Sequence, residues 1–235
     1  MQRVMYVVFG ILVFVAVFAV SLVRLWTDWL WFGSVGYEQV MLKIIMSKVT
    51  LGVAVGAGFF IVIAINLLIA DRLSRTGFIR TGENTIELPG IETLGPHTRL
   101  IALGAAAFLA LVMGLEASTR WDQYLLFINA TPFGMEDPLF SRDISFYVFK
   151  LPFLRYIYQW GVMVTVFSIA VAVFVYSVKR GIIISNEGVH YRMPTLAHLS
   201  VLVAAAVALK AFGYRLFAFS MLYTSRGFVS GPGYV

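Results

Sequence analysis

Three carboxylates fall close together in one polar stretch of the sequence: Glu136, Asp137 and Asp143. Several carboxylates in one loop can bind a hard cation such as Ca²⁺, but the spacing of an EF-hand loop is absent. A turn and a helix cap explain the same acids without an ion, because Asp137 precedes Pro138 and Asp143 precedes an apolar run. We therefore favour a structural role for these acids over a metal site, and we expect no cofactor.

Two further side chains of this stretch could take part in ordering it. Arg142 offers a cation beside the acids, and Tyr147 offers a phenolic hydroxyl at the start of the apolar run. We predict that Asp137, Arg142, Asp143 and Tyr147 fix this loop by capping and ion pairing. We also predict that the loop is a docking surface.

The residues needed for common catalytic chemistry are missing or scattered. The chain has no cysteine, which excludes thiolate nucleophiles, disulfides and cysteine-ligated metal clusters. Its histidines, His97, His190 and His198, form no His-x-x-His pattern, and neither a P-loop nor a dinucleotide glycine fingerprint is present. We predict that the chain is not an enzyme.

The long apolar stretches contain polar residues but no Asp, Glu, Lys or Arg near their centres. An ionisable group within a membrane span usually marks function, so their absence argues against a transporter. For Asn66 we predict a hydrogen bond between helices. For His198 we favour packing or hydrogen bonding over a proton relay or ligand binding.

The composition indicates the elements that must hold these residues. Of 235 residues 60% are hydrophobic and 13% charged, whereas a soluble domain carries about 25% charge. The formal net charge of +6 comes from residues at the ends of apolar runs. Such flanking charge is typical of a protein whose partner is the lipid bilayer, and we expect no nucleic acid to bind.

We predict an all-α transmembrane protein with one transmembrane domain over residues 1–235. A spanning helix needs roughly 20 apolar residues, and five stretches approach or exceed this length. The third and fifth are short, so Arg99 and Lys210 should extend toward the headgroups. The predicted five-helix bundle has spans at 4–23, 49–70, 100–115, 156–178 and 193–209.

Charge and tryptophan distribution suggest the orientation. Lys and Arg are denser in residues 1–3, 71–99 and 179–192 than in the other loops, which predicts that these segments are cytoplasmic. All five tryptophans then lie at the outer face, where indole favours the headgroup region. We therefore expect a multi-pass protein of the cell inner membrane with a cytoplasmic N-terminus.

Shorter elements complete the prediction. Residues 181–192 have the pattern of a small cytoplasmic β-hairpin, and residues 119–129 that of an interfacial helix. Residues 24–48 should extend the second helix after a turn at Gly33–Gly36. The G-x-x-x-G motif at Gly52–Gly56 should let helices pack closely in a compact bundle, and we do not take it as evidence for a dimer.

Three stretches carry a family resemblance: WTDWLWFGSVGYEQV at 26–40, DPLFSRDISFYVFKLP at 137–152 and SRGFVSGPGYV at 225–235. They resemble a large uncharacterised family of prokaryotic multi-pass membrane proteins with no assigned activity. The resemblance implies that this chain matches only the N-terminal membrane portion of a longer protein, with later spans and an extracytoplasmic domain. We therefore expect a fragment.

These observations favour a membrane anchor or scaffold. Its partner would be an extracytoplasmic protein or the missing C-terminal domain. The alternative is a component of a transporter or channel, for which the missing spans would have to supply the charged residues.

Overall fold

The computed structural model describes residues 2–74, 97–179, 182–185, 188–191 and 193–223. The chain divides into two compact units, Met1–Thr50 and Leu51–Val235. Each unit is described by itself below.

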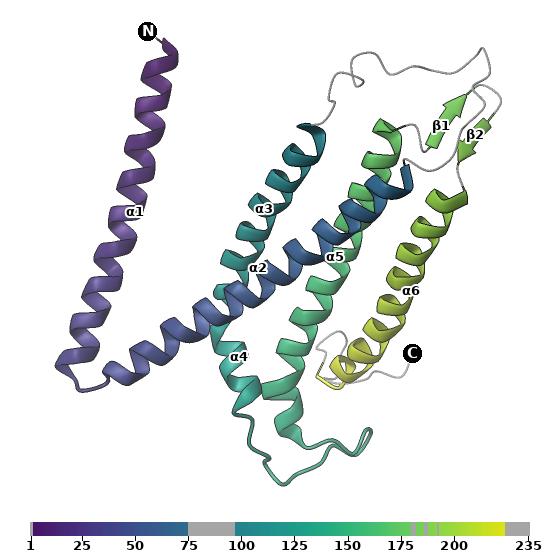
Figure 1. The fold of residues 1–235 in the computed structure, drawn as a ribbon. Coiled ribbons are helices and arrows are strands. Elements are labelled where there is room, and N and C mark those ends of the chain that lie inside the picture. The colour runs from purple at the N-terminus through teal and green to yellow at the C-terminus, as the bar shows by residue number, and fades with distance from the viewer. Residues whose placement is uncertain (1, 75–96, 180–181, 186–187, 192, 224–235) are drawn as a thin grey trace. The chain divides into compact units, whose positions relative to one another are not determined.

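The first unit holds one long helix and the start of a second (Figure 1). Helix α1 covers Gln2–Ser34, and α2 covers Glu38–Ser74, of which residues 38–50 belong to this unit. The turn between them contains Gly36, whose φ of 75° favours glycine and ends α1. The predicted turn and extension of the second helix are therefore confirmed, whereas α1 continues past the predicted end at residue 23.

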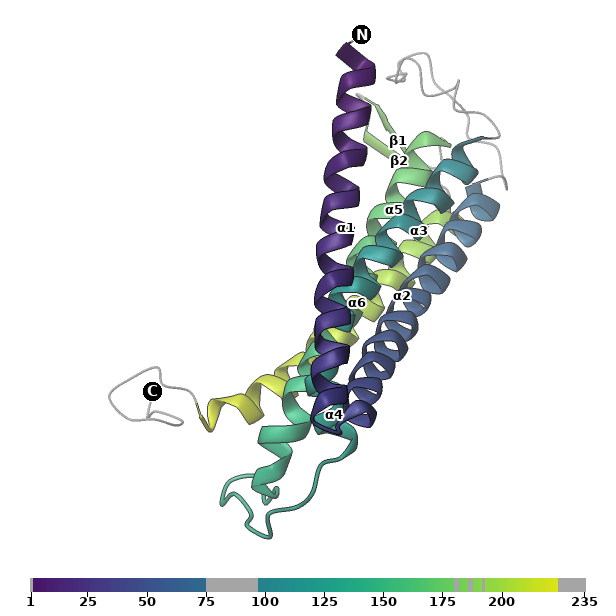
Figure 2. The same ribbon diagram turned by 90° about the vertical axis from the view of Figure 1, so that its left-hand side faces the viewer.

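Four long helices run through the second unit: the rest of α2, α3 (His97–Ser118), α5 (Leu151–Val178) and α6 (Met193–Met221) (Figures 1 and 2). Within the described residues four helices are long and apolar enough to cross a membrane, which indicates a membrane protein. The predicted five-helix bundle is not what the structure shows. Because α1 belongs to the other unit, the packing seen is that of four helices.

The core of this unit follows one stripe of α2. Phe59, Ile63, Leu67 and Ala70 recur at helical spacing and are at most 3% exposed. The first two pack with residues of α3 and α5, and the last two pack with a second buried cluster on α5. This stripe therefore fixes which faces of α3 and α5 turn inward.

Glycines bring α2 and α3 into backbone contact. A Cβ atom built on Gly52 would lie 2.9 Å from the carbonyl oxygen of Gly114, and one on Gly56 would lie 2.8 Å from that of Ala110. Any side chain at these positions would collide with the neighbouring backbone. The G-x-x-x-G motif thus serves packing within the chain, as the sequence predicts.

Three short elements lie at the two ends of these helices. Strands β1 (Ile182–Ser185) and β2 (Gly188–Tyr191) pair antiparallel after α5. Their cytoplasmic placement is not a property of the fold and stays a prediction. At the opposite end, α4 (Trp121–Ile128) forms where a short helix was predicted, and its place at the membrane interface stays a prediction.

Two helices extend beyond the predicted spans at this opposite end. Helix α6 continues past residue 209, and the exposed Lys210 places its ammonium 5.3 Å from the ring centroid of Tyr214. The limits of the spans in the bilayer stay a prediction. Before α5, the π-helical turn η2 (Phe146–Lys150) adds length to the predicted start at residue 156.

Candidate functional site

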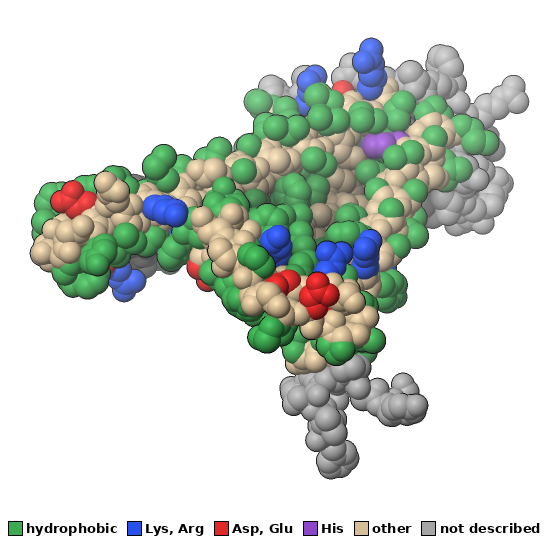
Figure 3. Space-filling view, turned by 90° about the horizontal axis from the view of Figure 1, so that it is seen from below, with side chains coloured by type: hydrophobic (Ala, Val, Ile, Leu, Met, Phe, Trp, Pro, Cys, Tyr) green, Lys and Arg blue, Asp and Glu red, His purple; other side chains and the backbone are tan. Residues whose placement is uncertain are grey.

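The stretch between α4 and α5 carries the four loop residues that the sequence singled out, and we call it the loop. We call the end of the second unit that holds this loop, the start of α5 and the end of α6 the loop end. Figure 3 looks at this end and shows basic and acidic side chains gathered among apolar ones. Two of its carboxylates, those of Asp137 and Asp143, organise the backbone around them.

Asp137 acts as the first anchor. Its Oδ1 accepts hydrogen bonds from the N–H groups of Leu139 and Phe140, over 2.9 and 2.7 Å. Its Oδ2 accepts the N–H of Arg142 over 3.0 Å and the hydroxyl of Tyr147 over 2.7 Å. Four donors therefore satisfy this carboxylate, and the turn that Pro138 predicts closes around it.

Asp143 acts as the second anchor. Its oxygens accept the N–H groups of Phe133, Gly134 and Ser145 over 3.0, 2.8 and 2.8 Å. The last of these bonds lies at the start of η2 and so has the geometry of a helix cap. The two sides of the loop also meet directly, since the N–H of Ile144 donates to the carbonyl of Met135 over 2.9 Å.

The hydrogen bonds favour the charged form of both acids. Partial desolvation acts to raise the pKa of Asp137, but the donors of Phe140, Tyr147 and the other contacts outweigh it and lower the pKa to about 2. Hydrogen bonds from Ser145 and Phe133 hold the pKa of Asp143 well below its usual range. Both loop anchors are therefore carboxylates at neutral pH.

Arg142 takes a different role from the predicted one. Its guanidinium lies over the ring of Phe146, 5.5 Å from the centroid, while its backbone supplies the contact to Asp137. Among the described residues it forms no ion pair. Arg142 therefore contributes a backbone N–H and a cation–π contact, whereas the sequence suggested ion pairing.

An aromatic cluster ties this loop to the last turns of α6. Phe219 is 8% exposed, and the rings of Phe140, Phe146 and Tyr147 meet its ring edge-on at centroid distances of 5.0, 5.3 and 6.3 Å. Tyr147 also holds Asp137, so the same side chain joins the polar and the apolar contacts. The loop is therefore fastened both to itself and to α6.

The predicted polar residues of the spans lie apart from this loop. The side-chain amide of Asn66 donates to the carbonyl of Ser168 over 2.8 Å, which confirms the predicted hydrogen bond between helices. His198 Nδ1 lies 2.7 Å from the hydroxyl of Tyr176, joining α6 to α5. The side chains of His97 and His190 are outside the described residues.

Some polar contacts were not predicted. Asp71 on α2 pairs with Lys179 at the end of α5, and Arg155 Nη1 donates to the hydroxyl of Tyr223 over 3.1 Å. Both involve residues at the ends of apolar runs, and this placement is the signal that the sequence offers. Which partners meet could not be read without the helix packing.

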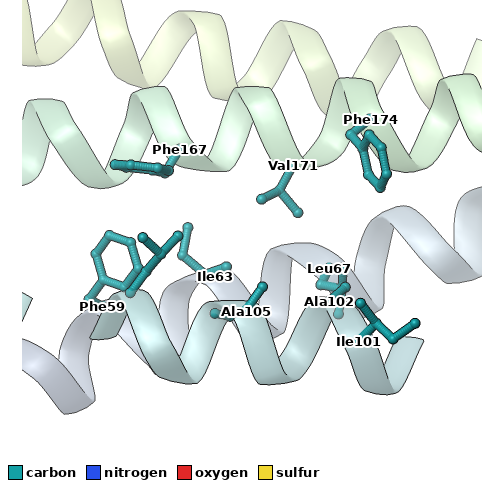
Figure 4. A pocket seen from close by; sticks show the side chains of 11 residues that line it. Phe59, Ile63, Leu67, Ile101, Ala102, Ala105, Phe167, Val171 and Phe174 are labelled. Carbon is teal, nitrogen blue, oxygen red and sulfur yellow. The ribbon is translucent and has the colours of Figure 1, made fainter. Parts of the chain in front are cut away.

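The described residues of the second unit line at least two cavities. One of about 300 Å³ lies between α2, α3 and α5, and Figure 4 shows the side chains of Phe59, Ala105 and Val171 pointing toward it. Its lining is entirely apolar. The other, of about 530 Å³, lies at the loop end between the loop and Tyr223.

Comparison with known proteins gives the chain its relatives. The model of the uncharacterised protein family UPF0182 matches residues 5–235. A UPF0182 protein of Pelotomaculum thermopropionicum is 36% identical over 223 residues, covering 90% of this chain and 24% of the relative. One from Saccharopolyspora erythraea is 33% identical over 226 residues, covering 96% and 23% respectively.

This chain spans about a quarter of the length of these relatives, so it matches a portion of larger proteins. No solved structure matches it. The match over nearly the whole chain agrees with the resemblance carried by its loop motifs, and the chain therefore belongs to the uncharacterised protein family UPF0182.

Proposed function

We propose that the chain is a multi-pass anchor of the cell inner membrane that holds and orients an extracytoplasmic domain or protein partner. In this proposal the N-terminus is cytoplasmic and the loop end of the second unit faces outward. The chain itself carries out no catalysis. The docking surface consists of the apolar side chains that the loop presents.

One observation carries this proposal: large apolar side chains of an ordered loop are exposed on the surface. Met135 and Leu139 are each 61% exposed, yet Asp137 holds the N–H of Leu139, and Asp143 holds the N–H of Gly134 next to Met135. Exposed apolar groups on a rigid base are typical of an interaction surface. Preorganisation also lowers the entropic cost of binding.

The length of the relatives supports the same proposal. About three quarters of each relative lies outside the region matched by this chain. A portion of that size could supply the domain to be oriented.

Photocrosslinking can test the docking surface. A benzoylphenylalanine at position 139 should form a discrete protein adduct in intact cells, or an intramolecular one in a full-length relative. A benzoylphenylalanine at Leu111 is the matched control, because Leu111 is also 61% exposed but lies within the apolar helix α3. Equal adduct patterns at the two positions would contradict the proposal.

A transporter or channel component is the second candidate. In the described part of the chain, Asn66 Oδ1 and Ser168 Oγ are buried polar atoms with no hydrogen-bond partner. Unsatisfied polar atoms inside a membrane span can line a pathway. Ion flux in vesicles that is lost in Asn66→Leu would favour this function over the anchor.

A further inference from the structure

Arg155 and Tyr223 are hydrogen-bonded to each other at the loop end. Arg155 Nη1 donates to the Tyr223 oxygen, and its guanidinium carbon lies 6.0 Å from the centroid of that ring. Since the Tyr223 oxygen accepts this bond, its own O–H is left to donate elsewhere. A guanidinium carries five N–H donors, and no carboxylate meets Arg155 within the described residues.

A mostly apolar cavity adjoins Tyr223. Tyr223 lines the cavity of about 530 Å³, together with the aliphatic groups of Pro138, Ile144, Val148 and Leu222. The carboxylate of Asp137 also lines it, but its two oxygens already accept four hydrogen bonds. The site therefore offers apolar walls beside unused cationic donors.

The position of the site matches the level of lipid headgroups. Arg155 stands in the first turns of α5, directly before the uncharged apolar run 156–178, and Tyr223 follows the last turn of α6. Arginine and tyrosine at the end of an apolar span lie where phosphate groups are abundant. An anion from the bilayer can thus reach the donors while its apolar part remains near the helices.

We propose that this site binds an anionic phospholipid. The phosphate accepts hydrogen bonds from the Arg155 guanidinium and the Tyr223 hydroxyl, and the adjoining glycerol and acyl carbons contact the cavity wall. A phosphate matches a guanidinium because both can form paired, charge-assisted hydrogen bonds. The inference does not rest on the proposed docking of a protein partner.

Lipid retention provides the test. The full 235-residue chain is purified from nanodiscs that contain equal amounts of phosphatidylglycerol and phosphatidylcholine, and the retained lipids are counted by native mass spectrometry. We expect wild type to retain phosphatidylglycerol about fivefold over phosphatidylcholine, as one cation near an anionic headgroup supplies about 1 kcal/mol. Arg155→Gln should lower this preference, whereas Tyr223→Phe should lower the number of lipids retained, because both lipids carry the phosphate that accepts its hydroxyl.

Arg120→Gln serves as the matched control, because Arg120 lies near the same end but its Nε is 3.4 Å from Glu116 Oε1. The control should keep the wild-type preference. Tyr223→Phe retains the ring and removes only one hydroxyl, so its folding can be checked against wild type by thermal unfolding.

Three outcomes would overturn the proposal. The first is equal retention of the two lipids by wild type, and the second is an equal loss of preference in Arg120→Gln. The third is displacement of the bound lipid by inorganic phosphate alone, which would make the site one for a free anion. Protein crosslinks at position 139 could persist in each case, so the proposed docking function is tested separately.

Discussion

Replacing Phe219 with alanine tests whether the aromatic cluster holds the loop to α6. The side chain is 8% exposed and meets three rings of the loop and η2, those of Phe140, Phe146 and Tyr147. Each edge-to-face ring pair contributes about 1 kcal/mol. Losing three should lower the free energy needed to open the loop by about 3 kcal/mol. This value lies within the usual cost of about 3–5 kcal/mol for removing a buried phenylalanine side chain.

Hydrogen exchange measures this effect locally. Because each 1.4 kcal/mol changes an equilibrium tenfold, the amides of Leu139, Phe140 and Arg142 should exchange roughly a hundredfold faster in Phe219→Ala. Phe212→Ala is the matched control, since Phe212 lies on the same helix but is 49% exposed. Unchanged exchange in the loop, with faster exchange elsewhere in α6, would refute the role of the cluster.

Three other perturbations follow from the packing and the loop. Gly56→Val should lower the free energy of unfolding in detergent by about 1–3 kcal/mol, because the new Cβ would meet a backbone oxygen on α3. Gly104→Val should leave this free energy unchanged, because no atom lies within 4 Å of a Cβ built there. Loop exchange, after correction for intrinsic rates, should be protected at pH 5–7 and lose protection as pH falls from the usual aspartate range toward 2. The sign follows because the folded pKa values of Asp137 and Asp143 are both depressed, so Asp137→Asn should remove only the contribution of Asp137 and leave that of Asp143. Asn66→Leu should cost about 0.6 kcal/mol in a reversible unfolding assay, typical of one hydrogen bond between membrane helices.

Local sequence patterns predicted much of the helical structure. The turn at Gly36 and the short helix α4 both follow from residues close together in the chain. The role of Asp137 was also accessible, because Pro138 marks a turn that an aspartate side chain can close. In each case the decisive contacts join residues a few positions apart.

Contacts between distant segments could not be predicted in the same way. Phe219 lies far along the chain from Phe140, and nothing in either segment identifies the other as its partner. The length of α6 beyond residue 209 could not be predicted from the span, because a helix can continue past a charge such as Lys210, whose ammonium lies near the ring of Tyr214. Ion pairing was expected at Arg142 because the sequence places it beside acids, but backbone N–H groups satisfy those acids first.

The orientation of the loop end is the claim on which the proposed anchor most depends. The chain has no cysteine, so a single cysteine at Leu139 or at Met193 can be labelled with a membrane-impermeant maleimide in intact cells. Both positions are more than half exposed and lie at opposite ends of the helices. We predict labelling at position 139 and none at 193 until the cells are opened. Labelling at 193 with protection at 139 would contradict the account.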